Sequence, residues 1–163
     1  MSGVRDAGAM SGAAPARWSV RGVATRLAAV GFVCGLGATV AAQTAPTAAE
    51  WHAIREVIAA QRAAIVAGDA DKAFGYASPG IQQQFGDAAS FLAMVDAAYA
   101  ALESARYVEF LEGAVIEGIV VQPLRLIDAD NTVRVALYTM EKQAGGEWRI
   151  SSCRIAPSTV RAA

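Results

Sequence analysis

From residue 47 onward, the spacing of hydrophobic positions along the chain changes at one point, near residue 105. Before that point, apolar side chains such as Ile54, Ile58 and Ile65 recur at helical spacing, which indicates helices with one buried face. After that point, apolar and polar residues tend to alternate, which indicates strands. Helices followed by strands predict an α+β domain, with the helices packed on one face of a mostly antiparallel sheet of about four strands.

Short polar residues and glycines mark where the predicted helices begin and end. Thr47 and Glu50 form the T-x-x-E pattern of a capping box, so the first helix is expected to begin there. Gly68 ends that helix because glycine takes the left-handed conformation easily. Asp69 then caps a short helix that runs through Tyr76.

The next segment contains a predicted break and a third long helix. Pro79 disfavours a helical residue before it, so the run from Ser78 to Gly80 is expected to be a turn. Residues 81–85 can form one further turn. Asp87 is expected to cap the last helix, whose apolar stripe reaches Leu102.

Four strand-like runs follow, at residues 106–112, 115–127, 132–142 and 147–155. Within the second run, Gly118 predicts a bulge or bend. The polar run from Asp128 to Asn131 and the glycines after Ala144 predict the turns between the later strands. Within the last run the apolar parity changes, which predicts a bulge at Ser151 and Ser152.

The first 42 residues have a different pattern. Three arginines, Arg17, Arg21 and Arg26, precede an apolar stretch that begins at Leu27 and ends in small residues at Ala42. This is the layout of a secretory signal peptide, so we expect cleavage near Ala42 and a periplasmic or secreted protein. An uncleaved membrane anchor is the alternative, and it is the only membrane contact that we expect. Translation starts at either Met1 or Met10.

These sequence patterns together divide the chain into four parts. Residues 1–42 are the expected signal peptide, and residues 43–50 form a short N-terminal segment with the helix cap. Residues 51–156 form the folded domain, and residues 157–163 form a C-terminal tail.

Composition narrows the class of protein further. After residue 42 there are ten Lys and Arg against fourteen Asp and Glu, a net charge of −4. Such an acidic domain is not expected to bind nucleic acid, which requires basic patches. Cys153 is the only cysteine left after cleavage, so no disulfide can form within the chain, and the thiol is either buried or free to pair between chains.

Three segments carry a family resemblance: GDADKAFGYASPGIQQQFG (68–86), FLAMV (91–95) with Tyr99, and EWRISSCRI (147–155). They are similar to an uncharacterised bacterial family, domain of unknown function 4864. Short helices before a curved antiparallel sheet also resemble the NTF2-like (cystatin-like) superfamily. The resemblance covers roughly Trp51 to Ala156. It implies a cone-shaped fold and an exported context, and it supplies no catalytic residues.

The sequence contains no convincing catalytic constellation. One weak possibility is a dehydratase- or isomerase-like enzyme that uses Glu109 as a pocket carboxylate, since burial would raise its pKa. This hypothesis requires Glu109 to point into the cone and fails if it lies on the convex face. Asp96 is a weaker alternative acid. The lone His52 is expected to be a surface residue, and no metal, nucleotide or flavin signature indicates a cofactor.

Aromatic and sulfur-containing side chains are the better functional clue. They either fill the core or line a pocket for a small apolar ligand, with Arg106 or Gln122 binding its polar end. The candidate pocket residues are Tyr76, Met94, Tyr99, Tyr107, Phe110, Gln122, Tyr138 and Met140.

The expected function is therefore a non-catalytic, exported binding or envelope accessory module that holds a small apolar molecule. One alternative is a homodimeric interaction module that associates through its sheet face. Exposed Val, Ile and Leu side chains on the outer face of residues 132–142 would favour that alternative. The other alternative is the small enzyme that uses Glu109.

Overall fold

A computed structural model describes residues 17–19 and 45–156. The helices lie at residues 48–104 and pack on an antiparallel sheet, which confirms the α+β class, whereas the NTF2-like cone remains a prediction. None of the helices in the described segments is long and apolar enough to span a membrane. The helices are α1 (Ala48–Val66), α2 (Ala70–Gly75), α3 (Pro79–Phe85), α4 (Ala88–Ala98) and α5 (Ala100–Ser104). The strands are β1 (Arg17–Ser19), β2 (Tyr107–Phe110), β3 (Ala114–Ile116), β4 (Ile119–Ile127), β5 (Val133–Lys142) and β6 (Trp148–Ala156).

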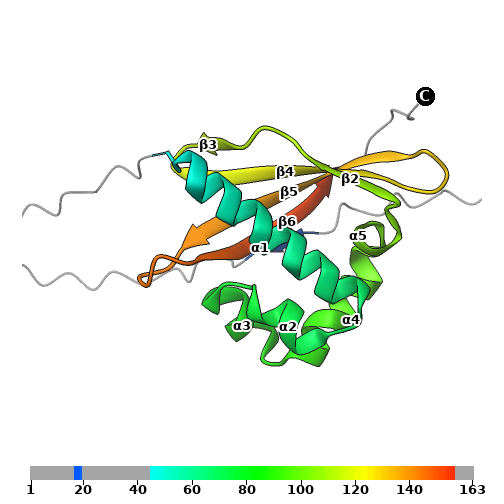
Figure 1. Cartoon of the computed structure of the whole chain (residues 1–163). Coiled ribbons are helices and arrows are strands. Elements are labelled where there is room, and N and C mark those ends of the chain that lie inside the picture. Colours follow the sequence, from blue (N-terminus) through cyan, green and yellow to red (C-terminus); the bar gives the residue numbers. More distant parts are fainter. Residues whose placement is uncertain (1–16, 20–44, 157–163) are drawn as a thin grey trace, which may run out of the picture.

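The strands form one antiparallel sheet in the order β1-β6-β5-β4-β2, and β3 also pairs with β4. Figure 1 shows α1 lying diagonally across one face of this sheet, with α2, α3 and α4 grouped beyond one edge. The three residues of β1 lie within the expected leader, and the proposed cleavage site near Ala42 lies outside the described residues.

The first helix begins as the sequence predicts. The Thr47 side chain accepts a hydrogen bond from the Glu50 amide, and the Glu50 carboxylate accepts one from the Thr47 amide, so the capping box is confirmed. Ile54, Ile58 and Ile65 form the buried stripe of α1 against the sheet. Each such buried aliphatic side chain contributes about 1.5–3 kcal/mol relative to an exposed one.

Two predicted boundaries in the helical half are wrong. Pro79 and Gly80 belong to α3, because Ser78 caps this helix and Pro79 occupies its first position, where its missing N–H is not needed. The predicted helix from Asp87 to Leu102 is two helices, because Tyr99 leaves the helical conformation at φ −129° between α4 and α5.

The second predicted strand is also wrong, whereas the predicted bulge is confirmed. Glu117 and Gly118 have positive φ angles of 52° and 79°, so the chain reverses there in a tight hairpin and β3 folds back on β4. In β6, Ser152 pairs with Thr139 and Ile150 pairs with Met140, which leaves Ser151 as the extra residue of the bulge.

Alternation along the strands separates an inner face beneath the helices from an outer face. On β4, the buried inner residues are Val120, Gln122, Leu124 and Leu126. Next to the segment of β6 that pairs with β1, the same edge is covered by the connection between α2 and α3, because the Ser78 amide donates to the Ile150 carbonyl (2.8 Å) and the Ile150 amide donates to the Tyr76 carbonyl (3.0 Å). This connection between α2 and α3 places Tyr76 beside β6.

Candidate functional site

A row of polar side chains crosses the inner face of the sheet. Gln122 of β4 pairs in register with Tyr138 of β5, which in turn pairs with Cys153 of β6, and all three side chains are fully buried. From the end of α4, the Tyr99 hydroxyl donates a hydrogen bond to the Cys153 carbonyl at 3.2 Å. The fold thus brings together three predicted pocket residues (Tyr99, Gln122 and Tyr138), which lie far apart in the sequence.

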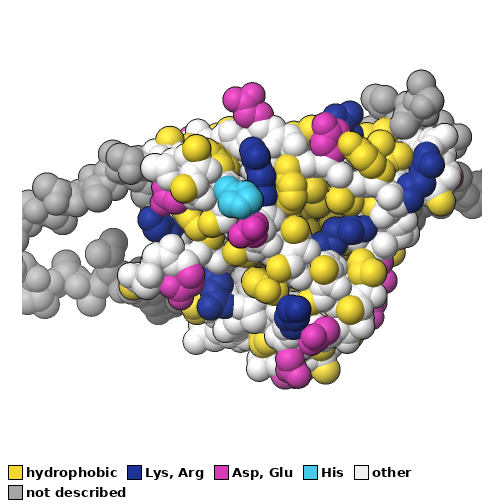
Figure 2. Space-filling model, in the orientation of Figure 1, with side chains coloured by type: hydrophobic (Ala, Val, Ile, Leu, Met, Phe, Trp, Pro, Cys, Tyr) yellow, Lys and Arg dark blue, Asp and Glu magenta, His cyan; other side chains and the backbone are white. Residues whose placement is uncertain are grey.

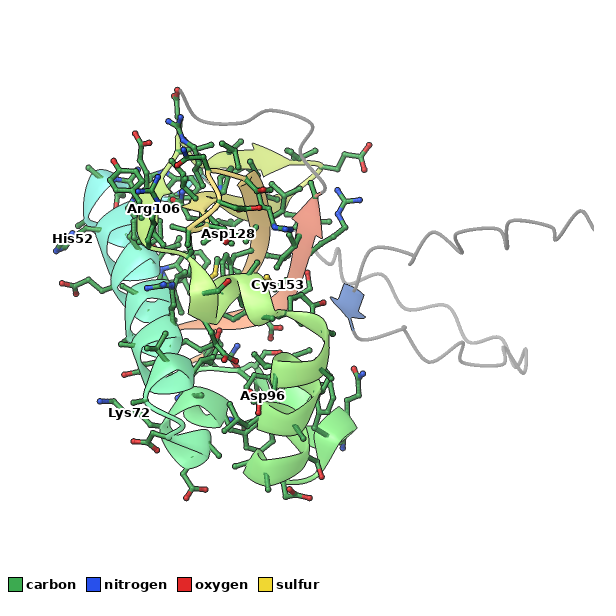
Figure 3. The ribbon with its side chains drawn as sticks, turned by 90° about the vertical axis from the view of Figure 1, so that its right-hand side faces the viewer. His52, Lys72, Asp96, Arg106, Asp128 and Cys153 are labelled. Carbon is green, nitrogen blue, oxygen red and sulfur yellow. The ribbon has the colours of Figure 1, made fainter. Side chains whose placement is uncertain are left out.

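Burial determines the chemistry of this row. It raises the pKa of Tyr138 well above its usual value, the neighbouring Cys153 thiol raises it further, and the charge of Arg62 opposes both. Burial also raises the pKa of Cys153. Both groups stay protonated at neutral pH, so Cys153 is a poor nucleophile. Figure 3 shows Cys153 between the helices and the sheet.

Two arginines on one side of α1 make hydrogen bonds to distant segments of the chain. Arg55 Nε donates to Gln122 Oε1 at 3.3 Å, and Arg62 Nη2 donates to the Ala105 carbonyl at 2.9 Å. The Gln122 amide is held in place because its Nε2 donates to the carbonyls of Leu111 (2.7 Å) and Pro123 (2.9 Å). Our sequence analysis missed both arginines, although their seven-residue separation places them on the same side of a helix.

A cleft of about 430 Å³ opens on the other side of α1, next to the turn between β5 and β6. Of the predicted pocket residues, only Tyr76 lines it. Trp148 of β6 also lines it; the ring of Trp148 lies 5.9 Å from the Lys142 ammonium group, and its buried Nε1 has no hydrogen-bond partner among the described residues. The lining residues are Ala53, Glu56, Val57 and Ala60 of α1, together with Tyr76, Gly146, Glu147 and Trp148.

The remaining predicted pocket residues do not line this cleft. Met140 is buried in the core, and Met94 and Phe110 are half-buried and pack against it. Tyr107 is 52% exposed and lies in register with Ile127 on the outer face of the sheet.

The candidate carboxylates lie away from the inner face. Glu109 pairs in register with Arg125 on the outer face, and its carboxylate contacts the Arg125 guanidinium at 2.5 Å. The condition that a Glu109 mechanism requires is therefore not met. Asp96 is exposed. Burial raises the pKa of Glu103, and the neighbouring Asp96 raises this pKa further.

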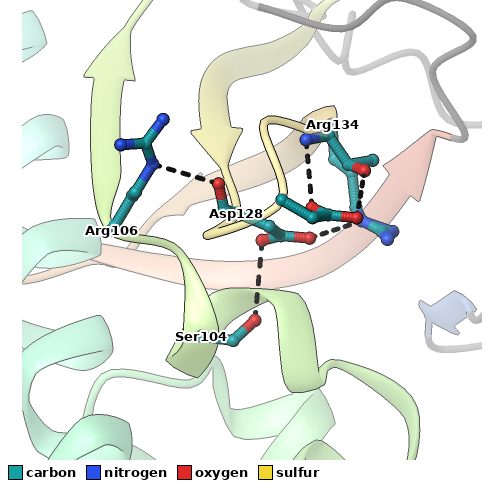
Figure 4. A network of polar contacts seen from close by, with 6 residues as sticks. Ser104, Arg106, Asp128 and Arg134 are labelled. Carbon is teal, nitrogen blue, oxygen red and sulfur yellow. Dashed lines mark hydrogen bonds and ion pairs between the residues drawn. The ribbon is translucent and has the colours of Figure 1, made fainter.

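Arg106 is hydrogen-bonded to the turn between β4 and β5 and does not reach the inner face of the sheet. Its Nε donates to the Asp128 carbonyl at 3.1 Å, and its Nη2 donates to Asn131 Oδ1. Asp128 also accepts hydrogen bonds from Arg134 (3.2 Å) and Ser104 (3.5 Å), as Figure 4 shows. This network ties α5 and β2 to the turn, and it gives Arg106 a structural role.

The single histidine is a surface residue. His52 points away from α1 and pairs with Glu56 at 3.3 Å (Figures 2 and 3). Within residues 17–19 and 45–156, no group of three or more His, Cys, Asp and Glu side chains could hold a metal ion.

The fold and these sites define a small α+β domain with two candidate binding regions, one on each side of a long helix. Residues 47–163 match the family described as "Domain of unknown function (DUF4864)", and the chain belongs to this family. No curated protein matches the chain, and no solved structure does.

Proposed function

We propose that the protein is a non-catalytic binding module that holds a small, largely apolar molecule in the cleft beside α1. The observation that carries this proposal is the cleft itself, which has two aromatic side chains, Tyr76 and Trp148, together with Ala53 and Val57. Its volume of about 430 Å³ lies in the range of sites for small molecules. Trp148 is largely buried, and within the described residues its indole N–H has no hydrogen-bond partner.

Binding is favoured over catalysis by the state of the titratable groups. Cys153 and Tyr138 are buried and protonated, and Glu109 is bound to Arg125 on the outer face. The acids beside the cleft, Glu56 and Glu147, contact His52 and Arg149. None of these groups is arranged as a nucleophile with an adjacent general base.

We further propose that the module acts outside the cytoplasm, in the periplasm or as a secreted protein. The basic and apolar halves of the leader support this location, as does the small residue at position 42. A lone buried thiol suits an oxidising compartment, because it cannot form a disulfide within the domain.

The binding site can be tested with a substitution on α1 that fills the cleft. We expect the neutral dye Nile red to bind wild-type protein saturably, with one site per chain, in a fluorescence titration. Ala60→Phe places a ring in the cleft and should weaken binding at least tenfold. Ala63→Phe is the matched control, because Ala63 is exposed on α1 and does not line the cleft. Equal affinity of both variants would show that the dye binds elsewhere, and no saturable binding would reject the proposal.

A second candidate function, homodimerisation through the sheet, is favoured by the outer face of β4 and β5. Val133, Val135 and Leu137 alternate with the inner residues of β5, and they lie beside Pro123 and Ile127 of β4. All five side chains are half-buried, and the described helices lie on the opposite face. The dimer hypothesis called for exposed apolar side chains on this strand, whereas these side chains are half-buried.

A further inference from the structure

Among the half-buried arginines of the described residues, Arg55 and Arg62 are the ones that no carboxylate contacts. Arg125, Arg134, Lys142 and Arg149 each contact a carboxylate. Within the described residues, neither Arg55 nor Arg62 does, and their hydrogen-bond partners are the neutral oxygens of Gln122 and Ala105.

The missing partners matter because both arginines are half-buried. A guanidinium group that is partly removed from water is costly unless a negative charge compensates for it. Acidic residues outnumber basic ones after residue 42, so an internal carboxylate could readily have filled this role. We infer that the compensating charge comes from outside the chain.

One polar atom of these arginines is also unsatisfied. Arg62 Nε is buried and has no hydrogen-bond partner among the described residues, whereas the Tyr138 hydroxyl lies against the Cys153 thiol. The Tyr138 side chain is completely buried, and the Arg62 charge acts on it. Buried polar atoms are normally paired, so an unpaired one on a cation is consistent with a polar ligand atom or water completing the site.

The inner face of β2, whose two ends the arginines reach through Ala105 and through Gln122, is apolar. Val108 and Phe110 occupy the inner face of β2, are half-buried and pack against the core. Figure 2 shows hydrophobic side chains between Lys and Arg side chains on the face that α1 crosses. Along the helix, Arg55 and Arg62 lie about 10 Å apart, so both guanidinium groups can reach a group held between them.

We propose that this face of the protein, between α1 and β2, binds a small amphipathic carboxylate. The carboxylate is held by Arg55 and Arg62, and the apolar body of the ligand packs against Val108 and Phe110. Planar guanidinium groups match a carboxylate well because they donate two parallel hydrogen bonds. This site is separate from the cleft on the other side of α1.

The experiment uses decanoate as the probe and 1-decanol as its neutral counterpart, with isothermal titration calorimetry on the whole chain. We expect decanoate to bind saturably with one site per chain, at least tenfold more tightly than 1-decanol. Arg55→Gln and Arg62→Gln should each weaken decanoate binding at least tenfold. Arg154→Gln is the matched control, because Arg154 is exposed on the outer face and makes the same change of charge.

A further variant separates loss of the ligand from loss of the fold. Ala59 is exposed on α1, four residues after Arg55 and three before Arg62. Ala59→Glu should supply an internal carboxylate to both arginines, which stabilises the helix while it blocks decanoate. We expect the variant to have an unchanged or higher melting temperature and at least tenfold weaker decanoate binding.

Three results would overturn the proposal: equal affinity for decanoate and 1-decanol, unchanged decanoate binding in Arg55→Gln and Ala59→Glu, or no saturable binding. The cleft variant Ala60→Phe should leave decanoate binding unchanged. The failure of one site is therefore distinguishable from the failure of the other.

Discussion

At the scale of single residues, Trp51 shows how one side chain sets the distance between two segments. It lies in the first turn of α1, and its ring packs on the backbone at Gly113, just before β3. A Cβ atom at position 113 would lie closer than 3.0 Å to three atoms of that ring. Position 113 therefore requires glycine because the Trp51 ring leaves no room for a side chain. The backbone angles at Gly113 do not themselves require glycine.

We predict that Gly113→Ala destabilises the protein by about 1–3 kcal/mol, the usual cost of overpacking. Gly75→Ala is the matched control, because a Cβ at Gly75 meets no atom within 4 Å. Its effect should stay within about 1 kcal/mol of zero. Urea unfolding followed by circular dichroism measures both changes. If Gly113→Ala proved as stable as the wild type, the tight contact with Trp51 would be incorrect.

At the scale of elements, the start of α1 is joined to the end of β5 by charge. Glu50 accepts hydrogen bonds from Thr47, and its carboxylate also contacts the Lys142 ammonium group at 2.7 Å. The contact with Lys142, and after it the hydrogen bonds from Thr47, lower the pKa of Glu50 from 4.5 to about 2. The capping box therefore also serves as a link between the helix and the sheet.

This pKa shift predicts a pH dependence of stability. Because the pKa is lower in the folded state, the contribution of Glu50 is present above about pH 4.5 and is lost as the pH falls toward about 2. In Glu50→Gln, the free energy of unfolding should therefore fall less steeply over this interval than in the wild type. The measurement is urea unfolding at several pH values.

The control for this pH series is Glu112→Gln, which removes an exposed carboxylate that makes no hydrogen bond or ion pair within the described part of the chain. Its pH profile should follow that of the wild type more closely than the Glu50→Gln profile does. Parallel profiles for wild type and Glu50→Gln would argue against the Lys142 link.

At the scale of the whole molecule, the sheet has two unlike faces. The inner face is covered by the helices and carries the buried polar row. The outer face carries apolar side chains of β4 and β5, with the Glu109–Arg125 ion pair beside them. Apolar side chains on an uncovered sheet face are typical of an interaction surface.

If the second candidate function is correct, wild-type protein should sediment as a dimer in analytical ultracentrifugation. Leu137→Lys places a charge at the centre of the outer face and should raise the dissociation constant at least tenfold. Ile116→Lys is the control, because Ile116 is 57% exposed at the β3–β4 hairpin, away from this face. A wild-type protein that stays monomeric at high concentration would rule out dimerisation through the sheet.

Much of the local structure can be predicted from the sequence alone. The caps at Thr47, Asp69 and Asp87 and the bulge near Ser151 depend on residues only a few positions apart. A side-chain oxygen that accepts from an amide three residues later needs no distant partner. For the same reason, the α+β class follows from the order of helical and strand-like spacing.

Tertiary structure alone decided where these elements meet and which way their side chains face. The spacing could place Tyr107 and Glu109 on one face of β2, but only packing against the helices made that face the outer one. The meeting of Arg55 with Gln122 likewise joins residues 67 positions apart, on a helix and a strand. Local spacing determines which residues share a face, whereas the burial of the whole apolar surface determines which face is inside.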